Sequence, residues 1–269
     1  MRIKLMCVMD TPARIPYNYN YELQKIIYQL IENSSPEFSE FLHNIGFIDG
    51  NSHFKLFTFS KLFFSDGYQD SEGFGGTTSF HLLFSTPVQK SYEHLVLGIF
   101  AKQKFTLYFS KDHAVSVTIE SVESLPEPDF EEGMRFVAVS PLVVSTIIEH
   151  NGKDVQHCLD YMNPLEREKF VANLKRNLLR KYRLINNKDF EGNPDFEFAF
   201  DVDYIMKRNG KIRKNIRFKK DEKSGKYSRI IGMEAPFTVK TDPELIKVGY
   251  QCGFGEKNSA GFGMGEAVL

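Results

Sequence analysis

Five glycines fall within thirteen positions near the end of the chain, as Gly253-Phe254-Gly255, five further residues, and Gly261-Phe262-Gly263-Met264-Gly265. Each glycine would cost about 1 kcal/mol relative to alanine inside a helix, so we expect a loop here. Exposed backbone amides in such a loop can bind phosphate oxygens. The intervening residues Lys257, Asn258 and Ser259 add a cation and two hydrogen-bonding side chains. The stretch is therefore a candidate site for a phosphate-bearing ligand.

Two common phosphate-binding motifs do not fit these glycines. A P-loop requires Gly-Lys-Ser/Thr at the start of a helix, whereas only four residues follow Gly265 in this chain. A dinucleotide-binding fingerprint requires a strand before the glycines and a helix after them, and four residues are too few for a helix. Two interpretations remain: a loop that binds a polyanion through its backbone, or a tight connection beside a terminal strand.

A tyrosine and a histidine leave the apolar faces of two expected helices. In the helix expected over residues 21–32, Tyr28 lies five positions after Leu23, which is about 140° around the helix axis. His43 has the same offset from Phe38 in the next expected helix. Both side chains therefore face the edge of the apolar stripe or the solvent. Taken alone, each is an ordinary surface residue.

The spacing of the two Gly-Phe-Gly groups resembles the C-terminal glycine-rich motif of the repeat-associated RNA-binding superfamily. Residues 247–264 resemble, more specifically, the CRISPR repeat-processing endoribonucleases of that superfamily, and residues 15–28, 55–60 and 139–142 also resemble this family. The resemblance implies a metal-independent endoribonuclease that cleaves CRISPR repeat RNA, single-stranded or hairpin, into guide units. The alternative is a non-catalytic RNA-binding subunit of an effector complex with the same fold and glycine loop.

The same resemblance implies three catalytic residues, Tyr28, His43 and Lys55, with His53 as a competitor for the role of His43. Cleavage of RNA without a metal uses the 2′-OH as nucleophile and leaves a 2′,3′-cyclic phosphate and a 5′-hydroxyl. Histidine can act as acid or base near neutral pH. Tyrosine, with an ordinary pKa of about 10, can donate or relay a proton. A lysine cation can stabilise the charge that develops on the phosphorane.

A basic segment is hidden within a nearly neutral chain. Residues 163–229 hold 19 Lys and Arg against 10 Asp and Glu, a formal charge of +9, although the whole chain carries −1. Such asymmetry favours a polyanionic partner. Apolar residues at strand spacing interrupt the charges of the expected hairpin, so one face can pack while the other meets phosphates. With Gly253, Gly255, Gly261, Gly263 and the three polar residues of the glycine loop, the expected RNA-binding residues include Lys211, Arg213, Lys214 and Arg217.

The elements that must position these residues follow from apolar periodicity. In residues 1–125 we expect a β-α-β-β-α-β order, with Ser35 and Pro36 starting the helix that carries His43. The expected strands are residues 2–8, 55–64, 78–86, 104–109 and 114–122; the expected helices are residues 21–32, a segment from 36, and 87–102. Residues 66–77 are expected to form a loop. A charged segment with prolines, residues 126–133, is expected to be a linker.

Residues 134–269 repeat this order more weakly. The expected elements are a strand at 135–140, a basic helix at 164–182 behind Asn163, a strand at 196–206, a hairpin turn at Asn209-Gly210, a returning strand at 212–219, and a weak helix around 242–248. The pattern predicts an α+β fold of two tandem ferredoxin-like (βαββαβ, RRM-like) domains. The family resemblance strengthens this prediction, because that family is built of two such domains.

Composition excludes several other classes of protein. The three cysteines are far apart without a Cys-x-x-Cys pair, and the remaining histidines lack ligand spacing. We therefore expect no disulfide framework, no metal site and no cofactor. We find no signal peptide and no run of about 18 apolar residues, so we expect a cytoplasmic protein without a membrane partner. The 25 phenylalanines predict phenylalanine-rich cores. A homodimer is compatible with these features.

Overall fold

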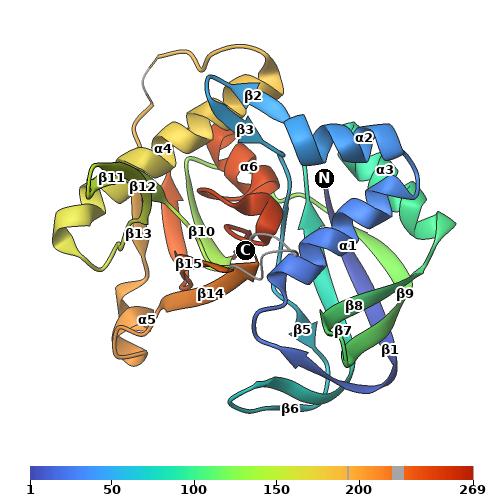
Figure 1. The fold of residues 1–269 in the computed structure, drawn as a ribbon. Coiled ribbons are helices and arrows are strands. Elements are labelled where there is room, and N and C mark those ends of the chain that lie inside the picture. Colours follow the sequence, from blue (N-terminus) through green and yellow to red (C-terminus); the bar gives the residue numbers. More distant parts are fainter. Residues whose placement is uncertain (193, 220–226, 269) are drawn as a thin grey trace.

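The computed structural model describes residues 1–192, 194–219 and 227–268, and shows a mixed α/β protein with two main antiparallel sheets (Figure 1). We call residues 1–125 the first half and residues 134–268 the second half. The sheet of the first half has the order β4-β7-β1-β9-β8, and β5 and β6 also pair with β7. Its strands are β1 (Arg2–Pro16), β4 (Thr58–Phe59), β5 (Phe63–Phe64), β6 (Tyr68–Gln69), β7 (Gly73–Ser85), β8 (Lys104–Ser110) and β9 (His113–Leu125).

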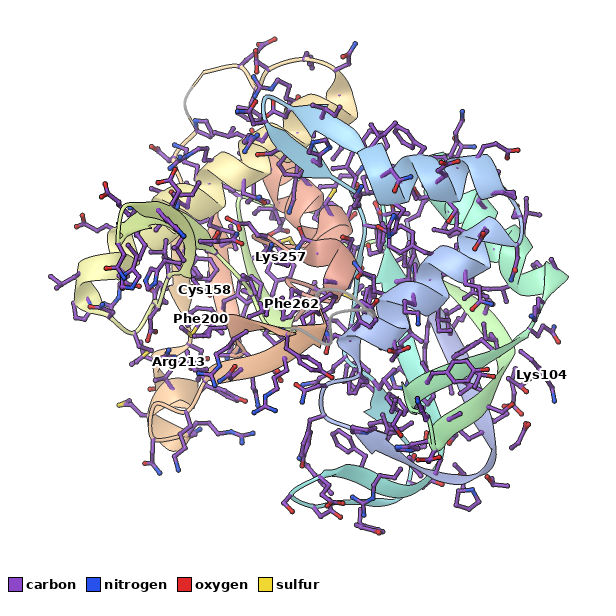
Figure 2. All side chains as sticks on the ribbon, in the orientation of Figure 1. Lys104, Cys158, Phe200, Arg213, Lys257 and Phe262 are labelled. Atoms are coloured by element: carbon purple, nitrogen blue, oxygen red, sulfur yellow. The ribbon has the colours of Figure 1, made fainter. Side chains whose placement is uncertain are left out.

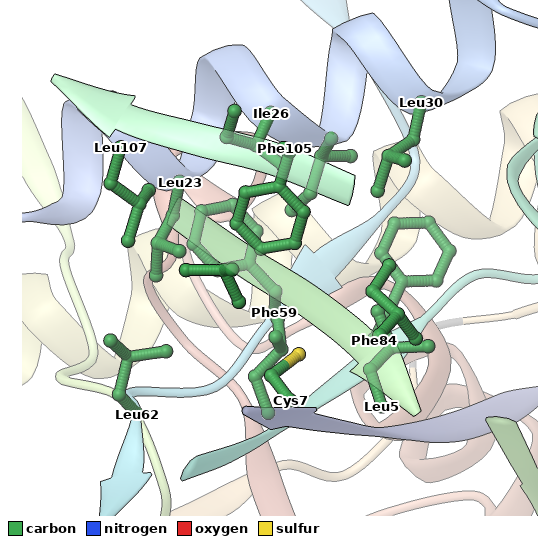
Figure 3. Packing of buried hydrophobic residues seen from close by; sticks show 14 of the residues in the cluster. Leu5, Cys7, Leu23, Ile26, Leu30, Phe59, Leu62, Phe84, Phe105 and Leu107 are labelled. Atoms are coloured by element: carbon green, nitrogen blue, oxygen red, sulfur yellow. The ribbon is translucent and has the colours of Figure 1, made fainter. Parts of the chain in front are cut away.

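Alternation along β1 creates the face on which the helices pack. Ile3, Leu5 and Cys7 are buried at every second position, as expected for a strand with one face on the core. Helices α1 (Asn20–Glu32) and α3 (Gln89–Ala101) cover this face, and Figure 3 shows side chains of α1 packed against those of the strands. The two helices are confirmed close to their predicted bounds, whereas β1 continues to Pro16, beyond the predicted end at residue 8.

A segment of irregular structure follows α1 and carries the predicted histidine. Helix α2 (Pro36–Glu40) begins as predicted, because the Ser35 hydroxyl accepts a hydrogen bond from Phe38 N at 3.3 Å. A π-helix (Phe41–Ile45) continues it, and a small hairpin of β2 (Phe47–Asp49) and β3 (Ser52–Phe54) follows.

Two predictions for the residues after this hairpin were wrong. The strand predicted over 55–64 is reduced to β4 and β5. Leu56 adopts a φ of +54° and interrupts the extended chain before β4. The loop predicted over 66–77 contains β6 and the start of β7, which pair with each other as a second hairpin.

The sheet of the second half has the order β13-β16-β10-β17. The strands are β10 (Gly133–Ala138), β13 (Glu197–Phe200), β16 (Phe237–Lys240) and β17 (Gly265–Ala267), and the main helices are α4 (Pro164–Asn186) and α6 (Pro243–Cys252). Both helices start as the sequence predicted, with the side chains of Asn163 and Asp242 capping backbone amides. The core is rich in phenylalanine, as expected: Phe136, Phe170, Phe200, Phe237 and Phe254 are fully buried.

The strand predicted over 212–219 pairs with a different strand from the one expected. Residues 196–206 are not one strand, because Asp201 accepts a hydrogen bond from Tyr204 N and starts helix α5 (Val202–Lys207). Asn209 and Gly210, both at positive φ, follow α5 and do not join two strands. Strand β14 (Arg213–Lys219) pairs instead with β15 (Tyr227–Met233), and their connection lies outside the described residues. A further hairpin, β11 (Ser145–His150) with β12 (Lys153–Cys158), precedes α4.

The two halves are joined through buried polar contacts. The Arg2 guanidinium is 1% exposed, donates to the carbonyls of Tyr250 and Gly265 at 2.8 and 3.0 Å, and lies 3.6 Å from the Tyr250 ring centroid. The backbone continues the connection, with Lys61 N bonded to Val139 O and Val139 N to Met264 O, each at 2.9 Å. Among the described residues, no helix is both long and apolar enough to cross a membrane.

Candidate active site

Tyr28, His43 and Lys55 come together in the structure. The rings of Tyr28 and His43 lie 5.4 Å apart, nearly perpendicular to each other. The Lys55 ammonium donates to the His43 carbonyl oxygen at 2.9 Å. Three elements therefore contribute: α1 supplies Tyr28, the π-helix supplies His43, and the chain just after β3 supplies Lys55. The exposed imidazole thus faces the tyrosine ring, and the lysine ammonium is bonded to the backbone of the same histidine.

Burial shifts the pKa values of Tyr28 and Lys55 in opposite directions. Burial raises the pKa of Tyr28 to about 12, although its hydrogen bond to the Ser259 side chain works in the opposite direction. Tyr28 is therefore a neutral hydrogen-bond donor at neutral pH and not a base. Burial lowers the pKa of Lys55 from its ordinary value. The Tyr28–Ser259 contact also links the cluster to the glycine-rich loop of the second half.

A cavity of about 710 Å³ opens beside this cluster and is lined by both halves. Lys55 and His53 line it from the first half, and the loop residues Lys257, Asn258 and Ser259 line it from the second half. Helix α4 contributes Asn173, Arg176, Asn177, Arg180 and Lys181. Sequence reasoning did not select these α4 residues individually; the only signal was the basic character of the predicted helix. The cavity is suited to a polyanion because cations face it from three elements.

His53 remains distinct from His43 in its contacts. Its Nδ1 is 2.8 Å from the Ile45 carbonyl oxygen, and its ring lines the cavity. The ring that faces Tyr28 belongs to His43. Gly46, which sequence reasoning missed, sits between them at φ +66°, where a Cβ would lie 2.4 Å from Phe54 O and 2.9 Å from Lys55 Cδ. Glycine is thus required for Lys55 to approach the π-helix.

The glycines of the C-terminal loop are buried, and Gly261 packs against the first half. A Cβ on Gly261 would lie 2.5 Å from the Phe59 ring, and one on Gly253 would lie 2.4 Å from the Asn258 amide nitrogen. A Cβ on Gly255 or Gly263 would lie 2.3 or 2.2 Å from a backbone oxygen. Packing inside the protein therefore explains why glycine is needed at all four positions. RNA contact by their backbone stays a prediction.

The three side chains of the loop have unequal roles. Lys257 is exposed, whereas Asn258 accepts a hydrogen bond from Lys181 Nζ at 2.7 Å and donates to the Phe262 carbonyl at 2.9 Å. The Ser259 carbonyl accepts from Gln24 Nε2 at 2.9 Å. Lys257 is thus free to meet a ligand, while Asn258 and Ser259 hold the loop against its neighbours. Figure 2 shows Lys257 and Phe262 near the middle of the molecule.

The basic hairpin stands apart from this cavity. Lys211, Arg213, Lys214 and Arg217 are all exposed, and Lys211 precedes β14, which carries the other three. Arg213 pairs with Asp160 at 3.1 Å. Lys214 lines a different cavity, of about 900 Å³, which also lies between the halves. The structure therefore does not bring the predicted binding hairpin together with the predicted catalytic residues.

Comparison with known proteins identifies the family. The family described as "CRISPR associated protein Cas6, C-terminal" matches residues 125–267, and "CRISPR-associated protein Cas6, N-terminal" matches residues 14–117. The chain is 33% identical to CRISPR-associated endoribonuclease Cas6 1 of Methanocaldococcus jannaschii, over 98% of this chain and 91% of that protein. It is 31% identical to CRISPR-associated endoribonuclease Cas6 of Pyrococcus furiosus, over 95% and 84%.

A solved structure named "CRISPR associated protein Cas6" superposes with a TM-score of 0.74 at 31% identity, covering 100% of this chain and 99% of that one. The matches span both halves, the Tyr28–His43–Lys55 cluster and the glycine-rich loop. The chain therefore belongs to the Cas6 family of CRISPR-associated endoribonucleases.

Proposed function

We propose that this protein cleaves CRISPR repeat RNA into guide units without a metal ion, using Tyr28, His43 and Lys55. The observation that carries the proposal is the Tyr28–His43–Lys55 cluster beside a cavity lined with cations. The relatives named above are endoribonucleases. The fold alone would not support a mechanism, because one fold can serve many functions. The cluster supplies the acid–base and charge-stabilising groups that RNA cleavage needs.

Each group has one task in the proposed reaction. The RNA 2′-OH attacks the adjacent phosphorus and loses its proton, the bond to the 5′-oxygen breaks, and that oxygen gains a proton. His43 exchanges a proton with the reacting oxygens. Tyr28, neutral because of its raised pKa, donates a hydrogen bond to the phosphorane, and Lys55 neutralises part of its charge. The products are a 2′,3′-cyclic phosphate and a 5′-hydroxyl.

The two halves are proposed to be tandem ferredoxin-like domains, residues 1–125 and 134–269, with residues 126–133 as the linker. Strand order supports this: β1 lies between β7 and β9, and β10 lies between β16 and β17. Each half thus places its first main strand between a strand that follows one helix and a strand that follows a second helix. This is the arrangement that βαββαβ connections produce. Strand β8 and the hairpins β11–β12 and β14–β15 are additions to this plan.

The proposed partner is the repeat RNA, with effector-complex subunits and a second copy of the chain as further possible partners. The exposed cations of the β14–β15 hairpin and Lys257 are proposed to contact RNA phosphates. The Gly253, Gly255, Gly261 and Gly263 backbone is proposed to shape the loop that presents Lys257.

Incubation of the purified protein with repeat RNA of its host, in the presence of EDTA, tests this proposal. We expect cleavage at one position. The upstream product should end in a 2′,3′-cyclic phosphate, and the downstream product should begin with a 5′-hydroxyl that a kinase can phosphorylate without prior phosphatase treatment. Tight RNA binding without cleavage would instead support the non-catalytic RNA-binding subunit. Cleavage that stops in EDTA and returns with Mg²⁺ would contradict the metal-independent mechanism.

A further inference from the structure

One turn of helix α4 in the second half reaches the catalytic segment of the first half. The Arg183 guanidinium contacts one carboxylate oxygen of Asp49 at 2.6 Å, and Arg180 contacts the other. Arg180 also donates to the Asp49 backbone carbonyl, and its guanidinium lies 5.1 Å from the Phe54 ring centroid. In Figure 1, β2 lies beside α4 at the top of the molecule.

The position of Asp49 gives this contact its meaning. Asp49 ends strand β2, at the tip of the hairpin that joins the π-helix to Lys55. The Lys55–His43 hydrogen bond closes the base of the same hairpin. Its tip is held by two arginines and its base by one lysine, so the spacing between His43 and Lys55 depends on both contacts. The Asp49 side chain is only 12% exposed, which makes its ion pairs stronger than pairs at an open surface.

The residue between the two arginines holds the other part of the site. Lys181 is 2% exposed, and its ammonium donates to Gly253 O, Gly255 O and Asn258 Oδ1 at 2.6, 2.8 and 2.7 Å. All three ammonium hydrogens are thereby satisfied. The loop turn held in this way carries Ser259, whose side chain is hydrogen-bonded to Tyr28.

We propose that Arg180, Lys181 and Arg183 of α4 are positioning residues for RNA cleavage: the arginines fix His43 and Lys55 through Asp49, and the lysine fixes Tyr28 through the glycine-rich loop. This inference rests on the proposed function. None of the three is assigned a contact with the reacting atoms. Catalytic groups from one half are thus held in place by a single turn of a helix from the other half.

An alternative role for the arginines is to bind RNA phosphate, with Asp49 as an internal competitor. Two observations favour positioning. Arg180 donates to the Asp49 backbone carbonyl as well as to its side chain. If an RNA phosphate took Arg180 away from Asp49, the hairpin would lose this backbone contact without replacement. Arg183 does not line the cavity. The two roles predict opposite effects of removing the Asp49 charge, because loss of a competitor would tighten RNA binding and leave the cleavage rate intact.

The test compares Asp49→Asn, Arg183→Gln and the double variant with the wild type. Single-turnover cleavage is measured at saturating repeat RNA, and RNA affinity is measured separately. We expect each single variant to slow cleavage on the order of tenfold, because small misplacement of reacting groups is costly. The Kd of Asp49→Asn should be unchanged. The double variant should be no slower than the slower single one, because both changes break one contact.

Arg135→Gln is the control, since Arg135 pairs with Asp201 at 2.5 Å and neither residue lines this cavity; it should cleave at the wild-type rate. Because Lys181→Met removes three buried hydrogen bonds and threatens folding, the Asp49 and Arg183 variants decide the first part of the proposal. Lys181→Met with intact circular dichroism should slow cleavage further at unchanged Kd; wild-type cleavage by this folded variant overturns the role of Lys181.

A second measurement does not depend on catalysis. Amide hydrogen exchange across residues 41–55 should be faster in Asp49→Asn than in the wild type, with other segments unchanged. Wild-type exchange there, or wild-type cleavage by Asp49→Asn, overturns the positioning role. If the wild type itself does not cleave repeat RNA, the proposed function fails, while the exchange result still decides whether α4 holds the hairpin.

Discussion

The two halves of this protein divide the work differently. The first half contributes Tyr28, His43 and Lys55, all suited to proton transfer or charge stabilisation. The second half contributes the exposed cations of the β14–β15 hairpin and the buried glycine-rich loop. Because these groups lie on different parts of the molecule, we expect that cleavage rate and RNA affinity can be changed separately. Substitutions of Tyr28, His43 or Lys55 should slow the reaction, and substitutions of the exposed hairpin cations should weaken binding.

The largest effect is expected from His43→Ala. Loss of the acid–base group should slow single-turnover cleavage by about 10²–10⁴-fold while RNA binding persists. His53→Ala is the control, because His53 lines the cavity but does not face Tyr28. If His53→Ala cleaved slowly and His43→Ala cleaved at the wild-type rate, the acid–base role would belong to His53.

Gly261→Val should break the contact between the halves. The new Cβ would lie 2.5 Å from the Phe59 ring at a φ of +82°, so we expect a loss of about 3 kcal/mol in the free energy of unfolding. Chemical denaturation measures it. Gly152→Val separates backbone strain from steric overlap, since Gly152 has a φ of +72° with nothing within 4 Å of its Cβ position. This variant should lose only the free energy that comes from backbone strain. Equal losses in the two variants would argue against packing at Gly261.

Tyr28→Phe should slow cleavage by about a hundredfold, the effect of removing one hydrogen-bond donor to the transition state. Burial raises the pKa of Tyr28 to about 12, so its proton remains as the pH rises past the ordinary tyrosine pKa of about 10. The ratio of wild-type to variant rates should therefore stay constant between about pH 6 and about pH 10. A ratio that changes near pH 8 would mean that Tyr28 ionises and acts as a base.

Charge reversal on the hairpin should weaken RNA binding on the order of tenfold or more without slowing cleavage at saturating RNA. Each lost phosphate contact should lower the salt slope of log Kobs by about 0.7 for single-stranded RNA. The residues changed to Glu are Lys211, Arg213, Lys214 and Arg217. The matched control reverses four exposed lysines of the first half: Lys90, Lys102, Lys104 and Lys111. Equal slopes for the two variants would make the hairpin an ordinary solvated surface.

Lys257→Ala should have the smallest effect, a loss of about threefold in RNA affinity and of about 0.7 in the salt slope. The fold should stay intact because Lys257 is exposed. Asn258→Ala, the neighbouring comparison, should instead lower thermal stability, because it removes an acceptor from Lys181. If Lys257→Ala bound RNA with the wild-type affinity, the loop would be a purely structural connection.

Local signals predicted the helices better than the strands. Ser35, Asn163 and Asp242 each cap the helix that the sequence placed there. The strand predicted over 196–206 failed because its alternation also contains a cap at Asp201, so one local pattern competed with another. The strand that pairs with β14 could not be predicted. Asn209-Gly210 is typical of a hairpin turn, but in this chain the two residues end helix α5 instead of joining two strands. Strand pairing depends on distant residues, whereas a helix cap depends on its neighbours.

The amino-acid sequence was enough to predict the family, from the spacing of two Gly-Phe-Gly groups, and to select Tyr28, His43 and Lys55 as candidate catalytic residues. Tertiary structure alone decided how these groups meet. Gln24 and Ser259 lie 235 positions apart and share a hydrogen bond, and Asp49 meets a helix 131 positions away. Such contacts leave no local pattern, because burial and pairing depend on the whole folded chain. The same reason hid the burial of the loop glycines: a side chain at Gly261 would meet the first half, and side chains at Gly255 and Gly263 would meet the backbone of the second half.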